Sequence, residues 1–443
     1  RNPVDQVINR YLHSRLHLIS PLIPEINDTT ENTGQLRPVL PRHLSFTDSL
    51  MNRIPSLEYP DSVSDKWLSL IRYYYNLKEQ GITSHILHYG DSQIEGDRIT
   101  FLLRDSLQHW FGGGGPGLFL PVMTVPITTT LRIDADEVWK KEACDLLPES
   151  KRVFPATGIF IEHVYVVPDV GNTNSNPLYA SFGVRLQSFA APLAKHPGRY
   201  RIWVRGDTGI IKLTVRIDNE EFSRSVTLNR TLQELSGELT GFTGRVNFAF
   251  ETSTPLIIEG VSLEKNPGII VDNIPLRGRA MTRFSRVNKN DLIRMLADMD
   301  VRLVMLQFGL NSVAGGQAGV KAYASNFRHQ LSVLRSVRPD IMVIVIGTTD
   351  MNMSRGISDS LSRQLRDIQR KVALEEGCLF WDSYRAMGGS GAAKKWFENN
   401  PPLIRPDYVH LSMDGSRLLA TMLTEALRRE IIPVIQNKEN PSE

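Results

Sequence analysis

The sequence predicts an α/β domain, built on a parallel sheet, that is interrupted by an inserted all-β sandwich. Short aliphatic runs separated by segments of helical spacing occupy both ends of the chain, which is typical of strands buried in a parallel sheet. Between about residues 125 and 265, hydrophobic residues instead alternate with polar ones, as in strands with one buried face. A chain of 443 residues is also long for a single domain.

The N-terminal part divides into an arm and a first α/β segment. Residues 24–46 are polar and contain prolines, so we expect an irregular arm over residues 1–45. In the segment 46–124, an apolar run at 86–89 leads into Gly90-Asp91-Ser92, and apolar residues at helical spacing follow from Ile99 to Trp110. The glycine-rich run 111–117 ends that helix. A phosphate-binding loop precedes its helix instead, so nucleotide binding there is disfavoured.

Residues 125–265 form the predicted insertion. Alternation is clearest at 200–204, 213–217 and 246–250, with further strand-like runs at 159–167, 179–189 and 256–263. These runs predict a jelly-roll-like sandwich of seven to nine short strands. Trp203 has two interpretations, a ring that stacks on sugars or a member of the sandwich core.

Residues 266–443 complete the α/β domain. Buried strands are expected at 302–308, 341–346 and 379–381, and helices around 323–334, 361–372 and 418–427. Right-handed crossovers between such strands create a crevice at the carboxyl edge of the sheet. That edge is where we expect the reactive groups.

Four residues at the ends of predicted elements supply the groups that ester cleavage needs. Ser92 would be the nucleophile, His410 its base, and Asp407, three residues before the histidine, the group that orients the imidazole. Asn311, in Gly309-Leu310-Asn311, would donate to the oxyanion together with the backbone N–H of Ser92. No metal or organic cofactor is expected.

Each residue also has a structural alternative. Ser92 and Asp407 are both of the type that caps helices, Asn311 of the type that stabilises turns, and His410 could be a surface histidine. Asp91 is expected to support the turn, since its side chain should point away from Ser92.

Two further features near the predicted crevice have two interpretations each. Asp350 is either a helix cap or a residue of the substrate cleft. The basic run is either a solvated face or a surface for an anionic glycan. It consists of Arg277, Arg279, Arg283 and Arg286.

These blocks resemble those of the SGNH, or GDSL-type, hydrolases, which carry a Gly-Asp-Ser block, a lone glycine, a Gly-x-Asn block and an Asp-x-x-His block. The resemblance implies a flavodoxin-like three-layer domain and assigns the nucleophile to Ser92, the acid to Asp407 and the base to His410. It assigns the oxyanion hole to Ser92, Asn311 and a glycine that we place at Gly278. Gln93 departs from the leucine usual after the serine, which argues against small-lipase substrates.

The longer run 89–97, the glycine run 111–117 and the β-rich insertion resemble bacterial peptidoglycan O-acetylesterases with a carbohydrate-module-like insertion. This resemblance implies an enzyme that removes acetyl esters from a glycan, most closely peptidoglycan. An O-acetyltransferase using the same acyl-enzyme, an esterase for xylan or another carbohydrate, and a non-catalytic glycan-binding protein are the alternatives.

Composition bears on partners and location. A formal net charge of +3 and the lack of a long basic run disfavour nucleic acid, and no apolar run reaches the roughly 20 residues of a membrane span. Arg1 in place of an initiator Met, together with the resemblance, suggests a secreted or periplasmic protein. Cys144 and Cys378 are expected to be separate thiols rather than a disulfide.

Overall fold

The computed structural model describes residues 54–143, 148–152, 159–168, 177–187, 190, 192–352 and 359–439. Residues 54–443 belong to one compact unit, and the description below concerns its described residues. The arm predicted for residues 1–45 and Cys144 lie outside the described residues.

A parallel five-stranded sheet forms the centre of the α/β part, with strand order β13-β1-β14-β15-β16. Its strands are β1 (Thr83–Gly90), β13 (Gly268–Pro275), β14 (Leu303–Gln307), β15 (Met342–Ile346) and β16 (Leu379–Trp381). Every residue of β14 and β15 is buried, which explains their short aliphatic sequences. The three strands expected after residue 266 are confirmed, and β13 is an addition to the prediction.

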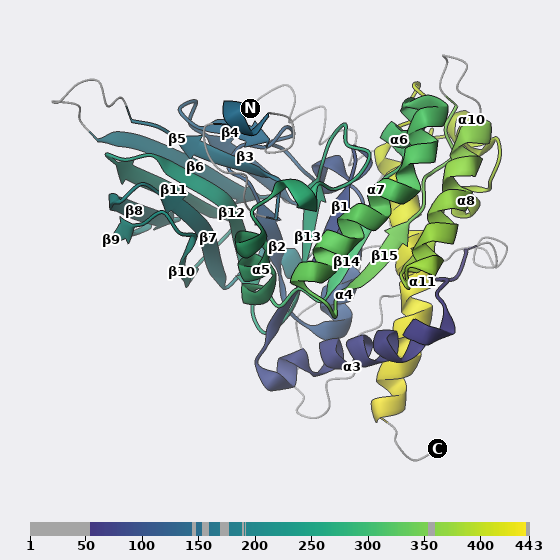
Figure 1. Ribbon diagram of the computed structural model, residues 1–443. Helices are drawn as coiled ribbons and strands as arrows, with labels where there is room; N and C mark the ends of the chain where they lie inside the picture. Colours follow the sequence, from purple (N-terminus) through teal and green to yellow (C-terminus); the bar gives the residue numbers. More distant parts are fainter. Residues whose placement is uncertain are drawn as a thin grey trace. The chain divides into compact units, whose positions relative to one another are not determined.

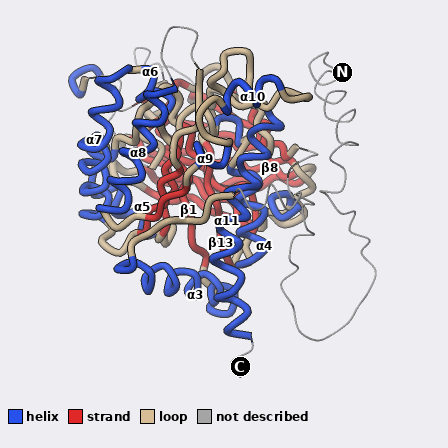
Figure 2. Tube along the Cα trace, turned by 90° about the vertical axis from the view of Figure 1, so that its right-hand side faces the viewer, coloured by secondary structure: helices blue, strands red, loops and turns tan. Residues whose placement is uncertain are grey.

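Helices cover both faces of this sheet, as Figures 1 and 2 show. One layer contains α3 (Ser64–Gln80), α4 (Thr100–Phe111) and α11 (Met413–Glu439), which pack on one another. The other contains α5 (Lys289–Asp298), α7 (Gly316–Val337) and α8 (Asp359–Glu375). Shorter helices are α6 (Leu310–Ala314), α9 (Ser383–Met387) and α10 (Ala392–Glu398). The three layers confirm the predicted α/β fold class.

The inserted part consists of two antiparallel sheets, one of six strands and one of five. The six-stranded sheet has the order β10-β7-β12-β5-β4, with β2 also pairing with β12. The other has the order β3-β6-β11-β8-β9. The bounds are β2 (Gly114–Phe119), β3 (Leu131–Ala135), β4 (Lys140–Ala143), β5 (Glu162–Val166), β6 (Leu178–Leu186), β7 (Arg199–Gly206), β8 (Gly209–Ile217), β9 (Glu220–Leu228), β10 (Gln233–Glu238), β11 (Arg245–Thr252) and β12 (Leu256–Lys265).

These sheets confirm the predicted all-β sandwich but contain more strands than the seven to nine expected. Strand β2 is largely glycine, and β4 is short and polar, so neither shows hydrophobic alternation. Trp203 is 1% exposed, with the Arg201 guanidinium 4.6 Å from its ring centre, and therefore belongs to the core.

The glycine run lies in the seam between the two parts, where β2 follows α4 directly. A Cβ added at Gly113 would lie 2.3 Å from the carbonyl oxygen of Ile269, and one at Gly115 would lie 2.3 Å from that of Leu263. Both glycines have positive φ, 91° and 86°. The run therefore allows close approach of backbones, which accounts for it without a phosphate ligand.

Buried charges link the sandwich to the α/β sheet. His85 of β1 contacts Asp272 of β13 through Nδ1 at 2.8 Å and Glu264 of β12 through Nε2 at 3.1 Å, and all three side chains are fully buried. Glu264 also accepts from Arg199 of β7 at 2.8 Å. Burial opposes the charged imidazolium, but the two carboxylates outweigh it and raise the pKa of His85 to about 9.

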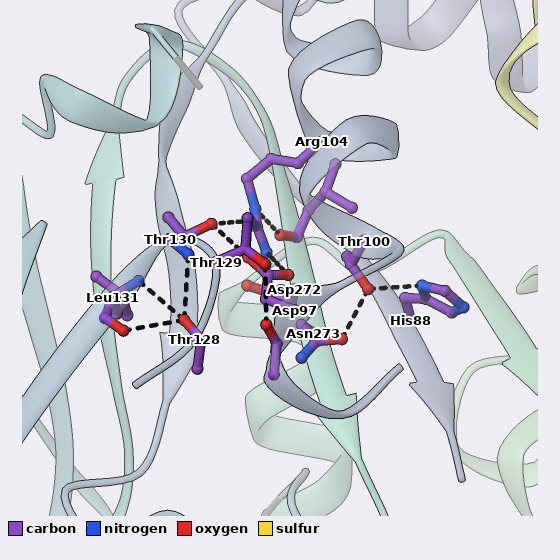
Figure 3. Close-up of polar contacts among 12 residues, drawn as sticks. His88, Asp97, Thr100, Arg104, Thr128, Thr129, Thr130, Leu131, Asp272 and Asn273 are labelled. Atoms are coloured by element: carbon purple, nitrogen blue, oxygen red, sulfur yellow. Dashed lines mark hydrogen bonds and ion pairs between the residues drawn. The ribbon is translucent and has the colours of Figure 1, made fainter. Parts of the chain in front are cut away.

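A second buried polar cluster secures the start of α4 (Figure 3). Arg104 donates to Asp97 through Nη1 at 2.7 Å and Nη2 at 3.1 Å, and Thr130, in the segment entering the sandwich, donates to the same carboxylate at 2.5 Å. Thr100 donates to Asn273 of β13 at 2.7 Å. These bonds hold the segment after the Gly-Asp-Ser block against the sheet.

Candidate active site

The Gly-Asp-Ser block forms a tight turn at the carboxyl end of β1. The backbone N–H of Asp91 donates to the Gln307 carbonyl of β14 at 3.1 Å, and a Cβ at Gly90 would lie 2.9 Å from the same oxygen. A 3₁₀ turn, η3 (Glu95–Asp97), separates Ser92 from α4. The turn presents Ser92 at the sheet edge where the crevice was predicted.

Ser92, His410 and Asp407 form a continuous hydrogen-bonded chain. Ser92 Oγ lies 2.8 Å from His410 Nε2, and His410 Nδ1 lies 2.7 Å from Asp407 Oδ2. The imidazole thus lies between a hydroxyl and a carboxylate although 318 residues separate Ser92 from His410. This is the geometry in which a histidine removes the proton of a serine nucleophile.

The loop 407–410 is held by the same carboxylate. Asp407 Oδ1 accepts from the backbone N–H groups of Val409 and His410, each at 2.9 Å. Although partial burial favours the neutral acid, these bonds and the His410 side chain together hold the pKa of Asp407 below its ordinary value. An ionised Asp407 favours the imidazole tautomer that carries its proton on Nδ1.

Asp91 supports the turn, as predicted. Its Oδ1 accepts from the Gln93 N–H at 3.0 Å, and its Oδ2 accepts from the N–H groups of Gly309 and Leu310, both at 3.2 Å. Burial raises the pKa of this carboxyl to about 6, even though the three backbone donors oppose the shift. Asp91 therefore joins the first block to the Gly-x-Asn block.

A hydrogen bond joins Asn311, in the first turn of α6, to the loop that contains Gly278. Asn311 Nδ2 donates to the Arg279 carbonyl at 2.9 Å, so the asparagine fixes the backbone next to Gly278. Gly278 has φ 76°, in the left-handed region, and a Cβ there would meet nothing within 4 Å. The backbone conformation at position 278, and not a lack of space for a side chain, therefore explains why this residue is a glycine.

Two residues at this site carried no predicted role. Gln93 is 3% exposed and donates to the Val409 carbonyl at 3.1 Å and to Thr349 Oγ1 at 3.3 Å. Arg98, 8% exposed, donates to the Ser92 carbonyl at 2.8 Å. The polar Gln93 in the place of leucine was a usable signal for the first, whereas nothing in the sequence distinguishes Arg98 from other arginines.

The capping alternatives do not match these contacts. The N-cap residue of α4 is Ile99, well beyond Ser92, and the first turn of α11 is capped by Ser412 Oγ, which accepts from Gly415. The cap interpretation of Asp350 does hold: it is 1% exposed, and its Oδ2 accepts from Ala393 in the first turn of α10 at 2.8 Å.

Arg277, Arg283 and Arg286 of the basic run are exposed. Arg277 contacts Glu95 at 3.3 Å, and Arg286 ends the 3₁₀ turn η6 (Phe284–Arg286).

Cys378 is a buried free thiol. Among the described residues, no cluster of three or more His, Cys, Asp or Glu side chains has an arrangement that could hold a metal ion. No described helix is both long and apolar enough for a transmembrane span.

Comparison with known proteins gives a structural match. No protein-family model matches the chain, and neither does any curated protein. The chain is similar to a solved structure described as "Peptidoglycan O-acetylesterase in action, 5 min", with 21% identity and a TM-score of 0.64, over 85% of this chain and 99% of that one.

Two other solved structures align less well. A family two carbohydrate esterase from Cellvibrio japonicus aligns at 11% identity and TM-score 0.27, over 68% of this chain and 98% of that one. An acetyl xylan esterase, AlAXEase, aligns at 18% identity and TM-score 0.26, over 36% of this chain and 81% of that one. Only the first alignment is close enough to compare architectures. By that alignment, the chain shares the overall fold of that structure, and its own fold is the one expected, a three-layer α/β domain with an inserted all-β sandwich.

Proposed function

We propose that this protein is a serine esterase that removes O-acetyl groups from a glycan, with peptidoglycan as the substrate. The hydrogen-bonded chain Ser92–His410–Asp407 carries the proposal. The His410 and Asp407 side chains are 35% and 47% exposed, so the site is open to an ester on a polymer. The fold shared with a structure described as a peptidoglycan O-acetylesterase supports the choice of substrate. The enzyme would then act at the cell envelope, where peptidoglycan lies.

In the first half of the reaction, His410 Nε2 takes the Ser92 hydroxyl proton while Oγ attacks the acetyl carbonyl carbon. The negative charge moves to the carbonyl oxygen, which the N–H groups of Ser92 and Gly278 and the amide of Asn311 would stabilise. The bond from carbon to the sugar oxygen then breaks. His410 returns its proton to that oxygen and leaves acetyl-Ser92.

In the second half, His410 takes a proton from water as the water oxygen attacks the acetyl carbon. Breakage of the bond to Oγ releases acetate, and the proton returns to Ser92. Asp407 stays ionised throughout and stabilises the imidazolium. A sugar hydroxyl in place of that water would give acetyl transfer, so the acceptor distinguishes an esterase from an O-acetyltransferase.

The test measures acetate released from O-acetylated peptidoglycan and from acetylated xylan. We expect release from peptidoglycan by the native protein, a loss of at least about 10³-fold in Ser92→Ala, and native activity in the control Ser332→Ala on the exposed side of α7. Equal activity of Ser92→Ala would refute the mechanism. Preference for xylan would refute the substrate, and acetyl groups gained by an added glycan acceptor would show transfer instead of hydrolysis.

A further inference from the structure

A cavity lies on the sandwich, and none of the residues that line it belongs to the Ser92 block. It has a volume of about 250 Å³ and is lined by the strands β3, β6 and β11 and the residues next to them. The lining residues are Asp134, Ala135, Asp136, Ser181, Gly183, Val184, Arg185, Arg245 and Asn247. Most are polar and lie on the outward face of the five-stranded sheet, whose inward residues form the sandwich core.

Three arginines stand side by side at one end of this cavity. Arg185 of β6 is directly opposite Arg132 of β3 on one side and Arg245 of β11 on the other. Like charges at directly opposite positions destabilise a sheet. Arg132 donates to Asp134 at 3.1 Å, whereas neither Arg185 nor Arg245 has an ion-pair or hydrogen-bond partner among the residues that the structure describes. The two exposed guanidiniums therefore leave a positive charge that an anion would neutralise.

The rest of the cavity suits the hydroxyl groups of a sugar. Two positions along β6 from Arg185, Gly183 lies opposite both Asp134 and Asn247, and the Asn247 amide nitrogen lies 3.4 Å from where a Cβ of residue 183 would be. Beyond it, Asp136 accepts from the Ser181 N–H at 2.6 Å. The cavity is thus lined, beyond the arginines, by the carboxylates of Asp134 and Asp136 and the amide of Asn247. These groups supply hydrogen-bond acceptors and donors for sugar hydroxyls.

Size and a neighbouring aromatic ring indicate an oligosaccharide. The volume lies below the roughly 300 Å³ at which pockets begin to hold drug-sized ligands, so the cavity suits one sugar residue. Tyr179, 65% exposed, is on the same face of β6 four residues from Gly183, about 13 Å along the strand at 3.3 Å per residue. An exposed ring at that distance can stack on a further sugar of the same chain.

We propose that this cavity binds a sugar that carries a carboxylate, with Arg185 and Arg245 on the carboxylate and Asp134, Asp136 and Asn247 on the hydroxyls. Paired guanidiniums bind a carboxylate through several charge-assisted hydrogen bonds, which neutral sugars lack. Both a lactyl ether, as in muramic acid, and a uronic acid present this chemistry. The site would hold the glycan chain whether or not Ser92 hydrolyses an ester.

The test measures binding by calorimetry to the full-length Ser92→Ala protein. The probes are peptide-free strands of alternating N-acetylglucosamine and N-acetylmuramic acid, oligogalacturonate, and neutral chitotetraose. We expect at least one acidic probe to bind and chitotetraose to bind at least tenfold more weakly. The acidic probe that binds identifies the source of the carboxylate. Binding of chitotetraose as tight as that of the acidic probes, or binding of no probe, would overturn the proposal.

Matched variants locate the binding. Arg185→Gln/Arg245→Gln should lose at least tenfold in affinity for the acidic probe, whereas Lys212→Gln/Arg216→Gln, with the same charge change on β8 of the same sheet, should stay within twofold. Hydrolysis of a small acetate ester by the Arg185→Gln/Arg245→Gln protein with Ser92 intact reports that it is folded, and the single Arg245→Gln variant provides a milder change. Native affinity in both arginine variants would contradict the assignment.

Discussion

The Gln93 side-chain amide joins the Ser92 turn to the His410 loop, since its Nε2 donates to the Val409 carbonyl at 3.1 Å. Its Oε1 also accepts from the Leu411 N–H at 3.4 Å. Because Ser92 precedes Gln93 and His410 lies between Val409 and Leu411, this one buried side chain helps to set the distance between the two groups that exchange a proton in the proposed mechanism.

Replacing Gln93 by Leu should therefore lower kcat by about tenfold, with a smaller change in KM, because Ser92 and His410 lose their common support. The buried Val409 and Leu411 backbone groups lose a partner, which should destabilise the protein by about 1–3 kcal/mol. Steady-state kinetics and urea unfolding measure the two effects. Gln93→Glu is a second variant, which keeps the shape of the side chain but removes the amide N–H that donates to Val409. Native kcat in both variants would argue against a positioning role for Gln93.

Replacing Asn311 by Ala removes one proposed oxyanion donor and the bond to the Arg279 carbonyl. We expect kcat on a soluble acetate ester to fall by about 10²–10³-fold with little change in KM, because an oxyanion donor acts mainly in the transition state. A rise in KM with kcat retained would instead place Asn311 in substrate binding.

Replacing Asp407 by Asn keeps an oxygen that can accept from Val409 and His410 but removes the charge beside the imidazole. The expected loss in kcat is about 10²–10⁴-fold, with the melting temperature close to native. Asp367→Asn, at an exposed carboxylate of α8 that is 59% exposed, is the control. If the control and Asp407→Asn retain equal activity, Asp407 does not orient His410.

A methyl group at Gly113 should destabilise the seam between the sandwich and the α/β sheet. Its Cβ would meet the Ile269 carbonyl oxygen at 2.3 Å, so we expect Gly113→Ala to cost roughly 3 kcal/mol or more. Gly81→Ala has a similar positive φ, 67°, with nothing within 4 Å, and should cost only about 1 kcal/mol. Urea unfolding compares them, and equal costs would mean that backbone conformation alone requires the glycine.

Stability should fall as pH rises from about 6.5 through 9. The folded pKa of His85, about 9, lies above the ordinary 6.5, so its contribution is complete below pH 6.5 and is lost as pH passes 9. At about 1.4 kcal/mol per pKa unit, the change is at most about 3.5 kcal/mol.

Urea unfolding of the native protein and of His85→Gln across this range measures the contribution. The variant should be less stable at pH 6.5 and show a shallower decline. Burial also raises the pKa of Glu259 to about 8, against the opposing effect of Arg205, so some decline remains. Identical declines in the two proteins would show that His85 does not titrate as proposed.

Local pattern was sufficient to predict most of the regular elements. The aliphatic runs of β14 and β15 reflect strands that are buried on both faces, and the helical spacing in α4 and α7 reflects helices that bury one face. Both signals depend only on the residues of the element itself. Strand β13 carries the short aliphatic run Ile269–Val271 next to the polar Asp272 and Asn273, whereas the glycine-rich β2 and the polar β4 have neither an aliphatic run nor alternation. These three strands are defined in the structure by their hydrogen-bonded pairing with β1, β12 and β5, which the sequence does not reveal.

The residue types needed for ester cleavage and their positions at the ends of predicted elements could also be read from the sequence, since a serine, a histidine and a carboxylate are recognisable by their chemistry alone. Only the tertiary structure brings Ser92 to within 2.8 Å of a histidine 318 residues away, and only it shows Gln93 and Asp91 bonding the separate blocks together. The reason is physical: a hydrogen bond depends on where two backbones meet, and local sequence constrains a chain's periodicity but not which distant segment it contacts.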